Sequence, residues 1–216
     1  MTSTISNYEY LYQNSDSGHH HQYLLSPLMQ ILAQANLSFP NKISVLDLGC
    51  GNGSLTNQIA RKGYQVTGIE ESLSGITYAR EHYTNCQFFQ GSIYTEPPSQ
   101  LQQAFDIVVS AEVIEHLYYP RELVKYARKC LKPNGKLILT TPYHGYFKNL
   151  FLALMGKTDP HYTALWDGGH IKFFSVNTLS NLIESEGFSN LEFQFAGRLP
   201  YLWKSMLCSC DLNYSA

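Results

Sequence analysis

Short apolar runs rich in β-branched residues alternate with helical segments along most of the 216-residue chain. The strands predicted from these runs are Ile43–Leu48, Gln65–Ile69, Gln87–Gln90, Phe105–Ser110 and Lys136–Thr141. The helices predicted between them are Leu55–Arg61, Leu73–His82 and Arg121–Leu131. Because parallel neighbours in a sheet need crossover connections, this alternation predicts a doubly wound α/β fold, with helices on both faces of a mostly parallel sheet.

One long segment, Pro142–Phe173, interrupts the alternation. A stretch of this length is uncommon in a compact domain unless it forms a lid or a binding loop, so we expect an inserted lid here. A helix at Val176–Glu186 is expected behind the N-cap Ser175. The strand-like runs Leu191–Phe195 and Leu202–Leu207 then complete a seven-stranded sheet.

Composition and length narrow the class of protein. Apolar positions at helical spacing make residues 1–36 a predicted N-terminal cap segment, and the length fits a single domain over residues 1–216. Fifteen Lys and Arg stand against seventeen Asp and Glu with no basic run, which disfavours nucleic acid as a partner.

Five scattered cysteines, with no C-x-x-C pair, favour reduced thiols over a disulfide or zinc framework. The polar first 18 residues lack the pattern of a signal peptide, so we expect a cytoplasmic location.

A predicted buried strand runs directly into three closely spaced glycines, Gly49, Gly51 and Gly53. The chain must bend sharply there and can let a ligand approach its backbone. The G-x-G-x-G spacing differs from the G-x-G-x-x-G of dinucleotide-binding proteins. Asp47 ends the strand just before the glycines and would repel a phosphate, so a ligand carrying a positive charge fits better.

Polar residues also follow the next two predicted strands. An acidic residue at the position of Glu70 can accept hydrogen bonds from both hydroxyls of a ribose. Ser92 can bond the edge of an adenine, and Ile93 can pack on its face. Because the carboxyl ends of parallel strands meet at one edge of the sheet, these groups converge on one nucleoside. The residues assigned to this site are Asp47, Gly49, Cys50, Gly51, Gly53, Glu70, Glu71, Ser92, Ile93 and Ala111.

Asp47–Gly53, Glu70 and Gly91–Ile93 resemble, in the correct order, three motifs of the class I S-adenosylmethionine-dependent methyltransferases. The resemblance covers roughly residues 43–207 and implies an enzyme of the Rossmann-like methyltransferase fold that binds S-adenosylmethionine and methylates a small molecule. Many members carry Asp where this chain has Ser92, which puts the strength of the adenine hydrogen bond in doubt. Two alternatives stay open: a non-catalytic protein that binds S-adenosylmethionine, and a nicotinamide-dependent oxidoreductase.

The segment after the fourth predicted strand carries Glu112, Glu115 and His116, which share one face if the segment is helical. This segment, together with Leu131–Gly135 and Gly169–Ser175, is most similar to the ubiquinone-biosynthesis O-methyltransferases. That resemblance implies a phenolic or quinol-like hydroxyl as acceptor and the two acids and the histidine as ligands of a divalent cation. In the alternative interpretation, Glu112 and His116 only support the site and Glu115 faces solvent.

The candidates for moving a proton are His116, Glu112, His170 and His144. The paired glycines before His170 allow close backbone approach, and an imidazole can act as a base near neutral pH. A histidine that is only hydrogen-bonded within a packed loop is an equal alternative for His170.

The inserted lid contains an apolar stripe with the period of an amphipathic helix. Its residues are Phe147, Leu150, Phe151, Leu154 and Met155. Three destinations are open: the core of the sheet, the cover of an apolar acceptor, or shallow peripheral contact with a membrane through residues 147–155.

Overall fold

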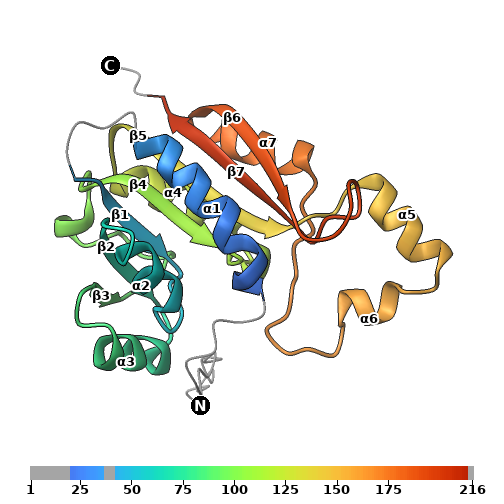
Figure 1. Cartoon of the computed structure of the whole chain (residues 1–216), viewed down its shortest axis with the longest axis horizontal. Coiled ribbons are helices and arrows are strands. Elements are labelled where there is room, and N and C mark those ends of the chain that lie inside the picture. Colours follow the sequence, from blue (N-terminus) through green and yellow to red (C-terminus); the bar gives the residue numbers. More distant parts are fainter. Residues whose placement is uncertain (1–19, 37–41, 214–216) are drawn as a thin grey trace, which may run out of the picture.

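The computed structural model describes residues 20–36 and 42–213 of the chain. Its sheet has the strand order β3-β2-β1-β4-β5-β7-β6, and β7 runs antiparallel to both of its neighbours (Figure 1). The strands are β1 Ser44–Leu48, β2 Gln65–Glu70, β3 Gln87–Gln90, β4 Phe105–Ala111, β5 Leu131–Pro142, β6 Phe188–Ala196 and β7 Ser205–Leu212. The expected doubly wound, mostly parallel seven-stranded sheet is therefore confirmed.

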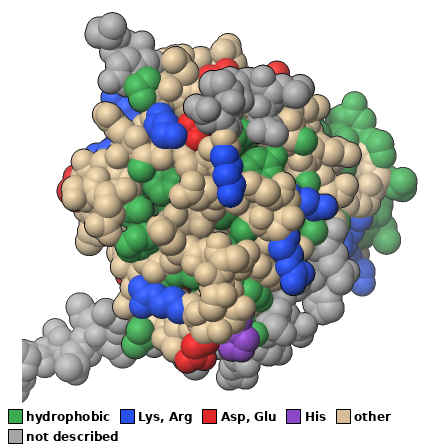
Figure 2. Space-filling view, turned by 60° about the vertical axis from the view of Figure 1, so that its left-hand side comes forward, with side chains coloured by type: hydrophobic (Ala, Val, Ile, Leu, Met, Phe, Trp, Pro, Cys, Tyr) green, Lys and Arg blue, Asp and Glu red, His purple; other side chains and the backbone are tan. Residues whose placement is uncertain are grey.

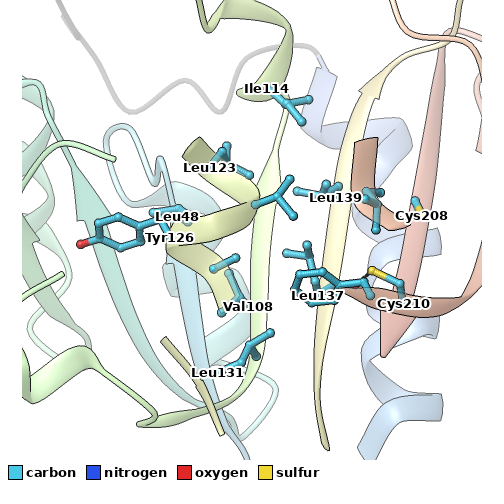
Figure 3. Close-up of a cluster of buried hydrophobic side chains, with 14 of the residues drawn as sticks. Leu48, Val108, Ile114, Leu123, Tyr126, Leu131, Leu137, Leu139, Cys208 and Cys210 are labelled. Carbon is cyan, nitrogen blue, oxygen red and sulfur yellow. Dashed lines mark hydrogen bonds between the residues drawn. The ribbon is translucent and has the colours of Figure 1, made fainter. Parts of the chain in front are cut away.

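Helices cover both faces of this sheet (Figure 1). They are α1 His20–Asn36, α2 Ser54–Ala60, α3 Leu73–His82, α4 Pro120–Cys130, α5 Tyr146–Leu154, α6 Thr158–Tyr162 and α7 Val176–Ser185, with short 3-10 turns η1 Ser99–Leu101 and η2 Ile114–His116. Side chains of α1 and α2 pack with Val109, Ile138 and Leu207 on one face. Those of α4 and α7 pack with Leu139 and Cys208 on the other, as Figure 3 shows for the α4 side. Neighbouring strand residues alternate between the two cores.

Three strands differ from their predicted bounds by more than one residue at an end: β5, β6 and β7. Strand β5 begins at Leu131, directly after α4, instead of at the predicted Lys136. Strand β6 begins at Phe188 instead of Leu191. Strand β7 begins at Ser205, and the predicted run Leu202–Leu207 is wrong by several residues. Small Cys and Ser side chains in β7 gave a weaker strand signal than the aromatic residues of the loop before it.

The inserted segment forms α5 and α6, which lie at one end of the molecule beside the β6–β7 connection (Figure 1). The apolar stripe of α5 is helical as predicted, but its five side chains are 41 to 77% exposed. The packing of this stripe into the core is therefore contradicted. Lys148 and Leu152 are buried in its place, because Lys148 Nζ donates a hydrogen bond to the carbonyl oxygen of Tyr143 at 2.6 Å.

Exposure of the stripe predicts that the paired substitution of Phe151 and Leu154 by Ser changes the free energy of unfolding by less than about 1 kcal/mol. The control is Leu152→Ser on the same helix, which replaces a side chain that is 8% exposed. Urea unfolding should show a loss of roughly 2–4 kcal/mol for this control. A comparable loss in the paired variant would show that the stripe is buried.

Candidate cofactor and acceptor site

The glycine turn connects β1 to α2 at the carboxyl edge of the sheet. Gly49, Gly51 and Gly53 all have positive φ angles, of 81°, 56° and 77°. The amide groups of Gly49 and Cys50 donate to the carbonyl oxygen of Ile69 at 2.9 and 3.0 Å. This clamp joins the turn to the end of β2, and the backbone takes a left-handed path that L side chains rarely adopt.

Asp47 lies beneath this turn and is 1% exposed. The Thr56 hydroxyl donates to its Oδ2 at 2.7 Å. Burial raises the pKa of Asp47 to about 7, although the Thr56 hydrogen bond acts in the opposite direction. Asp47 is thus bonded to α2, and its contact with a cationic ligand stays a prediction.

Glu70 is the last residue of β2, and its carboxylate binds the same turn. Its Oε2 accepts from the amide of Gly51 at 3.0 Å, and its Oε1 accepts from the amide of Ser72 at 2.9 Å. Burial raises the pKa of Glu70, although these two hydrogen bonds act to lower it. At the end of β3, Ser92 donates to Glu71 Oε2 at 3.2 Å. The structure therefore gathers the predicted turn, ribose acid and adenine loop at the carboxyl ends of β1, β2 and β3.

Glu112 and Glu115 lie on opposite faces of the sheet, and the segment does not form the helix that would have placed them on one face. Glu112 has a φ of 54°, and only the short turn η2 follows it. The Thr140 hydroxyl donates to Glu112 Oε1 at 2.9 Å, whereas the Thr141 hydroxyl donates to Glu115 Oε2 at 3.0 Å. Because neighbouring strand residues point to opposite faces, Glu112 lies on the α1 side and Glu115 on the α4 side.

Glu115 is 0% exposed, so the prediction of a solvated face for it is also wrong. Its Oε1 has no hydrogen-bond partner and lies 4.0 Å from His170 Nε2. Burial raises the pKa of Glu115 well above its ordinary value, and the nearby charge of Glu112 adds to the effect. A buried carboxyl oxygen without a partner is costly, which marks this position as one where a ligand is expected.

His116 is held by the inserted segment. Its Nδ1 lies 2.9 Å from the carbonyl oxygen of Gly168 and 3.2 Å from that of Gly169. Carbonyl oxygens only accept, so in the neutral ring the proton is on Nδ1 and Nε2 carries the lone pair. His170 and Trp166 stand edge-on to the same ring, with centroids 4.8 and 6.0 Å away.

Glu115, His116 and His170 each offer one ligand atom, and these atoms lie within 4.8 Å of one another. A carboxylate and two imidazoles are a suitable donor set for a divalent cation. Glu112 does not belong to this group, so the ligand set Glu112, Glu115 and His116 is corrected. His170 was expected only as a base, because a ligand distant in sequence leaves no spacing signal.

His144 lies elsewhere in the inserted segment and is 7% exposed. Its ring packs against Phe173 and Tyr162, with centroids 5.0 and 6.1 Å away. Burial and the nearby charge of Lys148 lower the pKa of His144 to about 3. An imidazole of such low basicity is a poor proton acceptor, so the prediction of His144 as a base is not supported by its surroundings.

Residues 17–192 match the family model of a methyltransferase domain. The chain belongs to this methyltransferase family. Together with the nucleoside edge described above, the match identifies a class I S-adenosylmethionine-dependent methyltransferase. Ubiquinone biosynthesis O-methyltransferases are similar to it: the mitochondrial protein of Schizosaccharomyces pombe is 26% identical over 76% of this chain, and that of Coxiella burnetii is 29% identical over 79%. The methyltransferase chain spans 65% of the first of these relatives and 73% of the second, and 41% of a third from Idiomarina loihiensis.

Solved structures of other proteins share the fold of this chain. The magnesium protoporphyrin IX methyltransferase of Synechocystis, solved with bound SAH, has a TM-score of 0.67 and 17% identity, covering 94% of this chain and 91% of its own. The PH0226 protein of Pyrococcus horikoshii has a TM-score of 0.70 and 20% identity, covering 94 and 95%. The sequence of this methyltransferase did not indicate the hydroxyl groups that donate to Asp47, Glu112 and Glu115, because Ser and Thr in strands and helices carry no motif. These donors are Thr56, Thr140, Thr141 and Ser205.

Burial of Asp47 predicts an unusual pH dependence of folding. Its folded-state pKa lies above the unfolded value, so the wild type loses stability as pH rises through about 7. Asp47→Asn cannot ionise, and its stability relative to wild type should therefore grow by roughly 2–3 kcal/mol between pH 5 and 8. Urea unfolding across this range measures the difference.

Asp106→Asn is the matched control for this pH series. Hydrogen bonds from Lys132 and Ser44 lower the pKa of Asp106 despite partial burial, so its contribution is complete above the unfolded pKa and constant from pH 5 to 8. Equal slopes for the two variants would contradict the assignment to Asp47.

Proposed function

We propose that this protein transfers a methyl group from S-adenosylmethionine to a hydroxyl of a small phenolic or quinol-like acceptor. The observation that carries the proposal is the orientation of His116, whose Nδ1 is tied to two carbonyl oxygens so that Nε2 can accept a proton. The names of the related ubiquinone biosynthesis O-methyltransferases support a hydroxyl as the acceptor group.

In this reaction the protein binds the cofactor, aligns the acceptor with it and deprotonates the acceptor hydroxyl. The turn at Gly49–Gly53, with Glu70 and Ser92 along the same edge, holds the cofactor, which supplies an electrophilic methyl group when bound. His116 Nε2 takes the hydroxyl proton as the acceptor oxygen attacks, and its Nδ1–H bond to Gly168 keeps the ring oriented. Alignment and exclusion of water supply the rest of the rate enhancement.

The inserted segment builds the acceptor side of this site. The amides of Ile171 and Lys172 both donate to the carbonyl oxygen of Glu115 at 2.9 Å, and Gly168 contacts His116. These bonds return the segment to the end of β4, where the methyl group would lie. This contact supports the assignment of residues 142–173 to acceptor binding.

A divalent cation can be held by Glu115, His116 and His170. Such an ion would lower the pKa of an acceptor hydroxyl that it binds. His116 would then be a ligand of the ion and not the base. The unpartnered Oε1 of Glu115 favours this second arrangement.

Substitution of His116 tests the proposal. His116→Asn keeps a side-chain N–H for the carbonyl oxygens of Gly168 and Gly169 but has no basic nitrogen, and His116→Ala removes both groups. We expect each variant to lose roughly 10²–10⁴-fold in kcat with unchanged affinity for S-adenosylhomocysteine. A screen of phenols and catechols with labelled S-adenosylmethionine supplies the assay, and calorimetry supplies the affinity.

Exhaustive chelation separates the two arrangements. Activity that survives chelation, with no ion found by metal analysis, assigns His116 as the base. Activity that is lost and is restored by Mg²⁺, together with loss in His170→Ala, assigns the cation. Full activity of both His116 variants would contradict the proposed chemistry.

The exposed stripe of α5 is proposed to contact the surface of a membrane that carries anionic lipid. Its five side chains continue into the β6–β7 connection, where the ring of Tyr201 lies 5.8 Å from that of Phe147. The exposed cations Lys157, Arg198 and Lys204 lie after α5 and within this connection, which suits anionic headgroups. Figure 2 shows hydrophobic side chains gathered at one edge of the molecule and cationic ones dispersed over the face in view. No helix in the part of the chain described here is long and apolar enough to cross a bilayer.

Co-sedimentation with vesicles tests this contact. The wild type should bind vesicles containing anionic lipid more strongly than purely zwitterionic ones, and substitution of Phe151 and Leu154 by Ser should reduce binding at least several-fold because apolar burial is lost. Leu73→Ser, which replaces another exposed leucine far from α5 in the sequence, is the control. Equal binding of all three proteins would exclude α5 as the contact.

A further inference from the structure

A chain of hydroxyl groups joins helix α1 to the end of β4. The Tyr23 hydroxyl lies 2.9 Å from Ser205 Oγ, and Ser205 Oγ donates to Glu112 Oε2 at 3.3 Å. Since the Ser205 proton is directed to the carboxylate, the Tyr23 hydroxyl is the donor in the first bond. Three elements that are far apart in the sequence, α1, β7 and the end of β4, thus meet at one carboxyl group.

Glu112 needs such support because its backbone is strained. Its φ of 54° lies in the left-handed region, which residues with a side chain rarely adopt. The backbone amide of Glu112 donates to the carbonyl oxygen of Thr140 at 3.1 Å, and the Thr140 hydroxyl donates to the other carboxyl oxygen. Bonds on both sides of the residue therefore hold it in this conformation.

The position of Glu112 decides where the next residues lie. Val113 follows at once, and its carbonyl oxygen accepts from the amide of His116 in the turn η2. That turn carries both Glu115 and His116. A rotation of the Glu112 backbone would move the His116 ring relative to the edge of the sheet.

We propose that Tyr23 is a positioning residue that acts through Ser205 and Glu112 to fix the turn bearing His116. This inference rests on the proposed function, because it assigns Tyr23 an effect on the rate of methyl transfer. The surroundings of Tyr23 suit this role, since its partly buried ring packs against the core on the α1 side of the sheet and Lys204 Nζ lies 5.0 Å from the ring centroid. The ring is therefore fixed independently of its hydroxyl group.

Tyr23→Phe removes one oxygen and keeps the packed ring, which makes it the primary variant. Ser205→Ala removes the middle group of the chain. Tyr64→Phe is the matched control, since Tyr64 packs on the same core at the far end of the sheet, beside the start of β2. All three variants, and Tyr23→Phe combined with Ser205→Ala, are made in the full chain.

The first measurement does not need activity. Hydrogen–deuterium exchange of a peptide covering residues 112–119 should become at least three-fold faster in Tyr23→Phe and in Ser205→Ala, because Glu112 is released. The same peptide should exchange at the wild-type rate in Tyr64→Phe. The combined variant should be no faster than Ser205→Ala alone, because both changes act through one carboxyl group.

The second measurement is steady-state kinetics with the acceptor found in the screen. A three- to ten-fold fall in kcat is expected for Tyr23→Phe, with an unchanged Michaelis constant for S-adenosylmethionine and a melting temperature close to that of the wild type. A purely structural role would lower the melting temperature and leave kcat of the folded fraction unchanged. That result, or unchanged exchange of residues 112–119, would overturn the proposal. Faster exchange of residues 112–119 in a protein that methylates no acceptor would retain the link from Tyr23 through Ser205 to Glu112 and reject the proposed function.

Discussion

Parallel pairing of β1 with β2 and β4 is the constraint on which the site depends. The three strands end at one edge, and the carbonyl oxygen of Ile69 on β2 accepts two amide hydrogen bonds from the glycine turn after β1. These two bonds tie the position of the turn to the end of β2. Side chains at the ends of these strands therefore lie close to the turn. Glu70, for example, accepts a hydrogen bond directly from the amide of Gly51.

The sequence predicted this edge well because its signals are local. Helix α3 has the predicted bounds Leu73–His82, and the glycine spacing placed the turn correctly. Prediction failed where the backbone departed from regular structure. Nothing in Glu112–Leu117 distinguishes a regular helix from a left-handed residue followed by a 3-10 turn, since the choice is made by hydrogen bonds to Thr140 and Ser205 on other strands.

The apolar stripe of α5 illustrates a second limit. Periodicity identifies which side chains share a face of a helix, but it does not say which face meets the protein. In α5 the face that is buried contains Lys148, whose ammonium group is satisfied by backbone carbonyl oxygens of Tyr143 and Lys204. Tyr143 lies just before α5 and Lys204 just before β7, so the sequence of residues 146–154 alone could not have indicated these acceptors.

The place of β7 in the sheet has a consequence for the order in which the molecule is built. β7 follows every other described strand along the chain, yet it lies between β5 and β6 and supplies Ser205 to Glu112. During synthesis, β1 to β5 can pair and form the cofactor edge before β7 leaves the ribosome, whereas β6 has no neighbour until β7 arrives. In a nascent chain, the edge with the glycine turn can therefore form before the Ser205–Glu112 hydrogen bond, which requires β7.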